Sequence, residues 1–144
     1  VAGADYWQAS ILKRWIADQV FRAVLIDRDP AKRQTDPVET VANVLRAGED
    51  VIFFPEGTRN LTDAPLLPLK SGIFHLAHAA PMAEIVPAWI LNLDRILPKG
   101  SILPVPLNCA VRFGAPLRPD KDESRDAFLI RLAEAMLALS DRRI

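Results

Sequence analysis

Two short apolar runs, each ended abruptly by charged residues, constrain the fold of this chain more than any other feature. Residues 23–26 read Ala-Val-Leu-Ile and run into Asp27, and residues 51–54 read Val-Ile-Phe-Phe and run into Pro-Glu-Gly-Thr-Arg. Apolar runs of this length that end at turn residues are typical of buried strands. We therefore predict a strand at each run, with a polar turn at its carboxyl end.

A helix is predicted between these two strands. Asp36 provides an N-cap, Pro37 suits the first helical position, and Glu39 lies three residues after the cap. Apolar residues follow at spacings of three and four, and Gly48 supplies the residue that commonly ends a helix. Further helices are expected at residues 9–20, 71–80 and 128–139, and further strands at residues 84–93 and 107–113.

Strands that alternate with helices in this way indicate an α/β fold, a layered structure in which helices flank a central, largely parallel or mixed sheet. The length of 144 residues suits one domain, and residues 1–144 show no linker or internal repeat. In such sheets, ligands bind beyond the carboxyl ends of the strands. The two polar turns are therefore the first places to look for a site.

The composition argues against several classes of protein. Lys and Arg total 18 and balance 18 Asp and Glu, so the excess basic charge typical of nucleic-acid binding is absent. No apolar stretch approaches the ~20 residues of a membrane span. The single cysteine, Cys109, favours a reducing compartment and is interpreted as a small buried hydrophobic residue. No Cys/His cluster has metal-ligand spacing, so no metal or cofactor is expected.

The polar turn after the second strand has the composition of an anion site. Arg59 offers two parallel donors, Thr58 offers a hydroxyl, and Gly57 allows a ligand to approach the backbone. Arg28, after the first strand, is placed to share the charge of the same anion, for which phosphate is the obvious candidate. The alternative is a set of ordinary surface ion pairs, in which Arg59 binds Glu56 and Arg28 binds the neighbouring aspartates.

The sequence Phe-Pro-Glu-Gly-Thr-Arg-Asn at residues 54–60 resembles the third block of the glycerolipid acyltransferase family. Residues 26–28 resemble its second block, residues 86–90 its fourth, and residues 70–72 its Lys-x-Gly, so the resemblance spans roughly residues 4–116. It implies a glycerol-3-phosphate acyltransferase-like fold. It also implies a substrate phosphate site formed by Arg28, Glu56, Gly57, Thr58, Arg59 and Lys70.

The resemblance implies an enzyme of phospholipid biosynthesis. Such an enzyme transfers a fatty acyl group from acyl-CoA or acyl carrier protein to a hydroxyl of a lysoglycerophospholipid or glycerol phosphate. In the family, the histidine of a His-x4-Asp block takes the proton from that hydroxyl. Here the only histidines, His75 and His78, are followed five positions later by Ala80 and Ala83, so no catalytic residue is assigned in this chain. We expect that an N-terminal truncation has removed the block and that the chain as given is inactive.

Two alternatives stay open. Residues 24–29 also resemble the Asp-x-Asp opening of haloacid-dehalogenase phosphatases, although no later block of that family follows. The second alternative is a non-catalytic phosphate-binding or interaction domain of the same fold.

The chain departs from the acyltransferase pattern at the second block. Arg22 and Leu25 replace the usual Gly and Phe there, so the match depends mainly on Arg28.

The expected location is cytoplasmic, with a peripheral place at the inner face of a membrane as a further expectation. The predicted helix at residues 9–20 has Lys13 and Arg14 opposite its apolar side, as helices on anionic lipid surfaces do. His75 and His78 are interpreted as ordinary residues of a helix surface or core. Because we expect missing residues to pack on the first two strands, we also expect an exposed apolar patch or self-association.

Overall fold

The structure is a computed structural model that describes residues 2–3, 25–26, 35–58, 60–91 and 109–140. The predicted helix at residues 9–20 lies outside these residues. Within these ranges, no helix has the length and apolar character needed to cross a membrane. The elements, in chain order, are β1 (Ala2–Gly3), β2 (Leu25–Ile26), α3 (Pro37–Arg46), α4 (Gly72–Ala79), β3 (Ala88–Leu91), β4 (Ala110–Phe113) and α6 (Arg125–Ala138).

Helix α3 begins where its capping residues predict. The side chain of Asp36 accepts a hydrogen bond from the N–H of Val38 at 2.9 Å, and Pro37 occupies the first helical position. A cap of this kind stabilises a helix by about 1 kcal/mol. The helix ends at Arg46, and Gly48 follows with a φ of +82°, a left-handed conformation that favours glycine. The predicted start and end of this helix are both confirmed.

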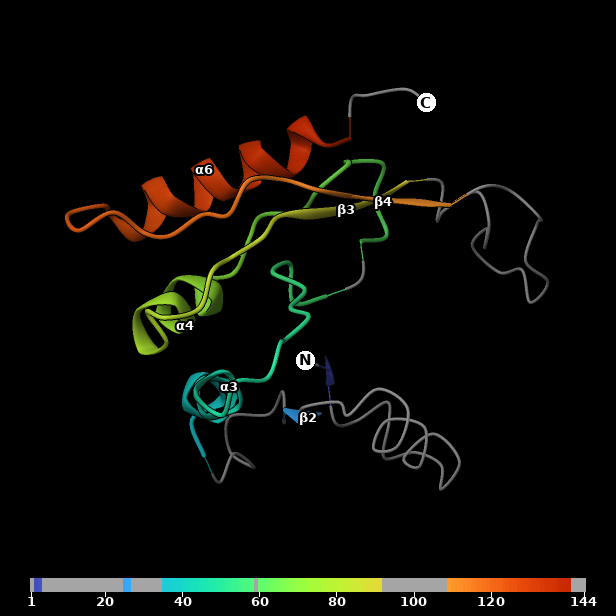
Figure 1. Cartoon of the computed structure of the whole chain (residues 1–144). Coiled ribbons are helices and arrows are strands. Elements are labelled where there is room, and N and C mark those ends of the chain that lie inside the picture. The colour runs from blue at the N-terminus through green and yellow to red at the C-terminus, as the bar shows by residue number, and fades with distance from the viewer. Residues whose placement is uncertain (1, 4–24, 27–34, 59, 92–108, 141–144) are drawn as a thin grey trace, which may run out of the picture.

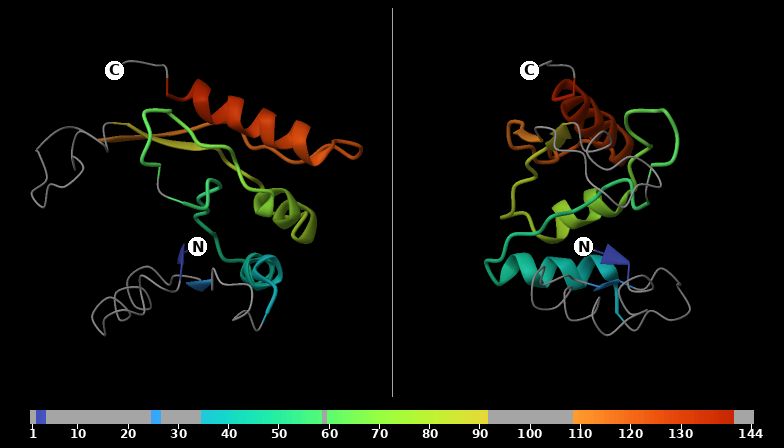
Figure 2. Two further views of the ribbon diagram at one scale, coloured as in Figure 1. Left: turned by 180° about the vertical axis from the view of Figure 1, so that it is seen from behind. Right: turned by 90° about the vertical axis from the view of Figure 1, so that its right-hand side faces the viewer.

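One hydrophobic core joins the three helices. Its buried side chains come from α3, from α4 with its C-cap, and from α6: Val41, Ala42, Ile73, Leu76, Ala80, Phe128 and Leu132. All views in Figures 1 and 2 show α4 between α3 and the part of the molecule that contains β3, β4 and α6. Packing against both other helices therefore fixes the position of α4.

The described strands form two separate pairs. Strands β1 and β2 are parallel, with Ala2 opposite Leu25, and strands β3 and β4 are antiparallel, with Ala88 opposite Phe113. The mixture of helices and strands agrees with an α/β fold. The described residues contain one parallel and one antiparallel pair, so the single layered sheet stays a prediction.

Residues 51–54 belong to no strand that the structure describes, so the strand predicted there is wrong. The side chains nevertheless alternate as they do in a strand. Val51 and Phe53 pack against the core, whereas Ile52 is 78% exposed and Phe54 is 65% exposed. The prediction that this run is buried is therefore wrong for Ile52 and Phe54. Assignment as a strand also needs a hydrogen-bonded neighbour, which the run itself does not specify.

Strand β4 presents its apolar side chains outward. Val111 is 50% exposed and Phe113 is 70% exposed, whereas Arg112 is half-buried and donates a 2.9 Å hydrogen bond to the carbonyl of Leu139 at the end of α6. Cys109, two residues before Val111, is exposed as well. The prediction of a buried cysteine is therefore wrong, because the strand places this side of its alternating pattern toward solvent.

Candidate functional site

The candidate site begins with a tight turn at residues 54–57, called the Gly57 turn below. The N–H of Gly57 donates to the carbonyl of Phe54 at 3.1 Å, which closes a four-residue turn with Pro55 in its second position. Proline in the second position and glycine in the fourth are favoured in type I turns. Gly57 has a φ of +67°, and both Gly57 and Thr58 are exposed. The local sequence therefore reverses the chain and leaves Gly57 and Thr58 open to solvent.

Two contacts bring Lys70 back to this turn. Its N–H donates to the carbonyl of Pro55 at 2.8 Å. Its aliphatic stem lies against Gly57, where an added Cβ would come within 3.3 Å of the Lys70 Cγ. Lys70 is exposed, and α4 begins two residues later at Gly72. A cationic side chain distant in sequence is thus held beside the predicted anion site.

Glu56 helps to close the base of the loop that leads from this turn back to Lys70. Its Oε2 accepts a part-buried hydrogen bond of 2.8 Å from the backbone N–H of Leu67, eleven residues later. The loop between these residues turns back on itself, and the carboxylate fastens the returning backbone to the turn. Compact loops whose ends lie together in this way are Ω-loops, which are frequently functional.

Asn60 organises the interior of the loop. Its Oδ1 accepts hydrogen bonds from the N–H of Thr62 at 2.9 Å and from the Thr62 hydroxyl at 2.8 Å. Its Nδ2 donates to the carbonyl of Ala64 at 2.7 Å. Asparagine forms such local turns readily. The segment therefore has internal order, although it contains neither helix nor strand.

The sequence predicts six phosphate-binding residues: Arg28, Glu56, Gly57, Thr58, Arg59 and Lys70. The structure brings Glu56, Gly57 and Lys70 together and leaves Thr58 next to them in the chain. The two arginines lie outside the described residues. The described part of the site is therefore a turn with an adjacent lysine, and its binding role stays a prediction.

Two organising groups of the loop were not foreseen from the sequence. Asn60, with Thr62 two residues later, is a readable signal of an asparagine turn. The backbone N–H of Leu67 has no such signal, because every residue except proline carries this donor. The partner of Glu56 could therefore be found only in the folded chain.

His75 and His78 do not belong to this site. Both are exposed on α4, and Nδ1 of His78 lies 2.9 Å from the carbonyl of Phe74 in the preceding turn of the helix. The interpretation of both histidines as ordinary residues of a helix surface or core is confirmed, and both lie on the surface. Among the residues that the structure describes, no group of three or more His, Cys, Asp or Glu side chains is arranged to hold a metal ion.

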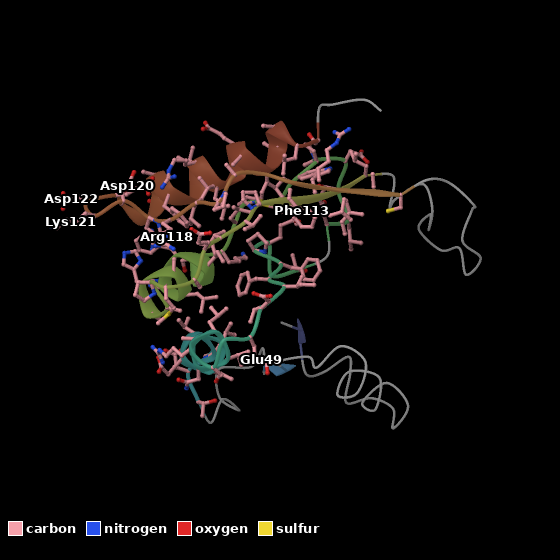
Figure 3. All side chains as sticks on the ribbon, viewed as in Figure 1. Glu49, Phe113, Arg118, Asp120, Lys121 and Asp122 are labelled. Atoms are coloured by element: carbon pink, nitrogen blue, oxygen red, sulfur yellow. The ribbon has the colours of Figure 1, made fainter. Side chains whose placement is uncertain are left out.

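A cavity of about 350 Å³ lies at the opposite end of α4, next to the turn that precedes α6. Its lining mixes apolar side chains with the polar residues His78, Arg118, Asp120 and Lys121. Figure 3 shows Asp120 and Lys121 at the tip of that turn, with Arg118 nearer to α4. Arg118 pairs with Glu84 at 3.2 Å. None of the four predicted phosphate-binding residues that the structure describes, Glu56, Gly57, Thr58 and Lys70, lines this cavity, so it is separate from the Gly57 turn.

Comparison with known protein families matches the chain to the model of the acyltransferase family over residues 1–91. This range includes the Gly57 turn, the Ω-loop, Lys70 and helix α4. No solved structure matches the chain significantly.

Several curated proteins are similar to this chain. A 1-acyl-sn-glycerol-3-phosphate acyltransferase from Chlamydomonas reinhardtii is 31% identical over 107 residues, which is 72% of this chain and 32% of that protein. A chloroplastic protein of the same name from Brassica napus is 35% identical over 78 residues, 54% of this chain and 22% of that protein. A 1-acyl-sn-glycerol-3-phosphate acyltransferase from Cocos nucifera is 31% identical over 96 residues, which is 66% of this chain and 30% of that protein. The chain spans about a third or less of the length of these relatives.

Proposed function

Because this chain belongs to the acyltransferase family, we propose that it binds the phosphate of an acyl acceptor. The acceptor is a lysoglycerophospholipid or glycerol phosphate, whose hydroxyl receives a fatty acyl group. The relatives support this class, since they are named 1-acyl-sn-glycerol-3-phosphate acyltransferases. The proposed acyl donor is acyl-CoA or acyl carrier protein.

The return of Lys70 to the Gly57 turn is the observation that carries this proposal. Backbone N–H groups in a turn and nearby cationic side chains together form anion sites in proteins. Arg59 follows Thr58 directly, and Arg28 comes two residues after β2 ends. Because β2 is paired in parallel with β1, its carboxyl end is where an α/β sheet binds ligands. We propose that both guanidinium groups complete the phosphate site, at the edge of a layered parallel sheet.

The proposed reaction is acyl transfer to oxygen. The acceptor hydroxyl oxygen attacks the thioester carbonyl while a general base takes the hydroxyl proton. A C–O bond forms, the C–S bond breaks, and the leaving thiolate takes up that proton from the base to become the thiol. A bound phosphate fixes the position of the hydroxyl, which lowers the entropic part of the barrier. This chain has no His-x4-Asp pair. We therefore expect it to bind the acceptor and not to transfer the acyl group.

A peripheral place at a membrane is part of the proposal, because a lysophospholipid acceptor resides in a lipid surface. Self-association of the chain is a further proposal. It is supported by large apolar side chains that the described residues expose, among them Ile52, Phe54, Val111 and Phe113. Light scattering at several concentrations tests it, and a monomer throughout the series would contradict it.

Calorimetry with glycerol 3-phosphate and with glycerol tests the proposed phosphate site. We expect saturable binding of the phosphate compound only. Arg59→Ala should weaken it by about 10–150-fold, the loss expected for one charge-assisted hydrogen bond of ~1.5–3 kcal/mol. Arg125→Ala removes an arginine paired with Asp126 on α6 and serves as the matched control. Equal binding of glycerol, or equal effects of the two substitutions, would refute the proposal.

An acyl-transfer assay tests the proposed lack of activity. The chain is incubated with acyl-CoA and 1-acylglycerol 3-phosphate, and release of the free thiol is followed. We expect no thiol release above the rate without protein. Turnover by the chain would show that a base other than a His-x4-Asp pair operates.

The calorimetric titration also tests the non-catalytic alternative. Binding of inorganic phosphate as tightly as glycerol 3-phosphate would favour the non-catalytic anion-binding alternative.

A further inference from the structure

Glu56 brings a negative charge to a turn that is proposed to bind phosphate. A carboxylate directed at a bound phosphate would oppose binding, because like charges repel. In the structure, this carboxylate is engaged elsewhere, since its Oε2 accepts the 2.8 Å hydrogen bond from Leu67. The role of Glu56 is therefore to be sought in the loop rather than in direct contact with the anion.

Three hydrogen bonds close the base of the Ω-loop. Two join backbone groups, from Gly57 to Phe54 at 3.1 Å and from Lys70 to Pro55 at 2.8 Å. The third joins the Glu56 side chain to the Leu67 backbone. Leu67, the donor of this third bond, lies three residues before Lys70. It belongs to the returning segment of the loop, which places Lys70 beside Gly57. The third bond is also the one of the three that a side-chain substitution removes directly.

We propose that Glu56 is a positioning residue, which acts on the bound phosphate through Lys70 rather than by touching it. By holding the N–H of Leu67, Glu56 fixes the path of residues 67–70 and keeps the stem of Lys70 across Gly57. The ammonium then stays beside the turn in the absence of ligand. This inference rests on the proposed function for the identity of the ligand, and on the structure alone for the position of Lys70.

The chemistry of the bond explains why an acid occupies this position. A carboxylate accepts an N–H more strongly than a neutral oxygen does, and a part-buried N–H that loses its acceptor is left unsatisfied. Glutamine retains an oxygen of the same reach and removes the charge. Alanine removes the acceptor. The two substitutions therefore separate the hydrogen bond from the charge.

A double-mutant cycle with glycerol 3-phosphate as the probe tests the proposal on the full chain. Glu56→Ala is expected to weaken binding about tenfold, the loss that corresponds to one ordinary hydrogen bond. Glu56→Gln is expected to stay within about threefold of the unsubstituted chain, because its amide oxygen still accepts from Leu67. In the Lys70→Ala background, Glu56→Ala is expected to add less than about twofold, because coupled residues are not additive. Full multiplication of the two effects would overturn the proposal.

Amide hydrogen exchange supplies a readout that does not depend on the ligand. The amides of Leu67 and Lys70 should lose protection in Glu56→Ala and keep it in Glu56→Gln. Glu134→Ala, which removes an exposed carboxylate on α6, is the control and should leave both amides protected. Unchanged protection in Glu56→Ala would overturn the positioning role. If the unsubstituted chain fails to bind glycerol 3-phosphate, the proposed function fails, and the exchange data alone then decide the role of Glu56.

Discussion

The aliphatic stem of Lys70 lies so close to Gly57 that a Cβ added to Gly57 would come within 3.3 Å of the Lys70 Cγ. Gly57 also has a φ of +67°, a backbone conformation that residues other than glycine rarely adopt. Gly48 has a comparable φ of +82°, but nothing lies within 4 Å of its added Cβ. These two glycines therefore separate the effect of backbone strain from the effect of contact with Lys70.

Gly57→Ala should weaken binding of glycerol 3-phosphate, whereas Gly48→Ala should not. Both substitutions should lower the free energy of unfolding by about 1–2 kcal/mol, because alanine is strained at a positive φ. Only Gly57→Ala also displaces Lys70, and a lost charge-assisted hydrogen bond would reduce the affinity by about tenfold or more. Urea unfolding and calorimetry measure the two effects. Equal affinities of the two variants would contradict the contact with Lys70.

Features that depend on neighbouring residues could be predicted from the sequence. Helix α3 starts at the predicted cap because Asp36 satisfies an N–H only two residues away. The turn at Gly57 follows from Pro55 and Gly57 themselves. In both places the sequence contains the two partners side by side, so local chemistry decides the structure.

Features that depend on distant partners could not be predicted in this way. Leu67 meets Glu56 through a backbone N–H, which no side chain marks. Arg112 lies on the inner side of β4 because the carbonyl of Leu139, at the end of α6, accepts its hydrogen bond. The outward side of β4, and with it the exposed Cys109, follows from that arrangement. The side chains of residues 51–54 alternate between core and solvent, which the apolar run did not indicate, and their assignment as a strand depends on partners outside the run.

Arg46 joins α3 to α4, and its loss should destabilise the chain. One guanidinium nitrogen donates to the carbonyl of Ala79 at 2.8 Å, and the other donates to Glu39 at 2.6 Å and to Asn43 at 2.8 Å. Arg46→Ala should lower the free energy of unfolding by about 1–3 kcal/mol, since it removes a bond between two helices. Glu39→Gln breaks only the exposed ion pair and should cost about 0–1 kcal/mol. A larger loss in Glu39→Gln than in Arg46→Ala, measured by urea unfolding, would contradict this role.

The pairing of Glu123 with Arg131 should make stability depend on acid pH. Arg131 donates to both carboxylate oxygens, at 2.6 and 2.9 Å, and these hydrogen bonds hold the pKa of Glu123 below its ordinary value of 4.5. Because the pKa is lower in the folded chain, the stabilisation is present above pH 4.5 and is lost as the pH falls through the folded value. Glu123→Gln should therefore flatten the acid side of the stability curve.

Arg131→Met is the partner test for this pair. It should flatten the same part of the curve, and the double variant should show no further flattening, because both substitutions remove one interaction. Urea unfolding between pH 3 and pH 7, roughly the range in which carboxyl groups titrate, gives the curves. Additive flattening would show that Glu123 and Arg131 act independently.

Phe128 should be a major source of stability through its place in the core. Its side chain is fully buried, at 0% exposure, and its ring lies 5.8 Å from that of Phe74 on α4. Phe128→Ala should lower the free energy of unfolding by about 3–5 kcal/mol, as expected for a large cavity. Ile130→Ala, on the same helix but 61% exposed, should change it by less than about 0.5 kcal/mol. Similar losses in the two variants would contradict the packing of α6 on α4.

The central proposal is that an acceptor phosphate binds at the Gly57 turn. Amide spectra of the ¹⁵N-labelled chain, recorded during titration with glycerol 3-phosphate and separately with glycerol, locate the bound phosphate directly. If the phosphate binds there, we expect saturable shifts at Gly57, Thr58 and Lys70 with the phosphate compound alone. Shifts confined to the cavity at His78 and Lys121, or the same shifts with glycerol, would contradict the proposal.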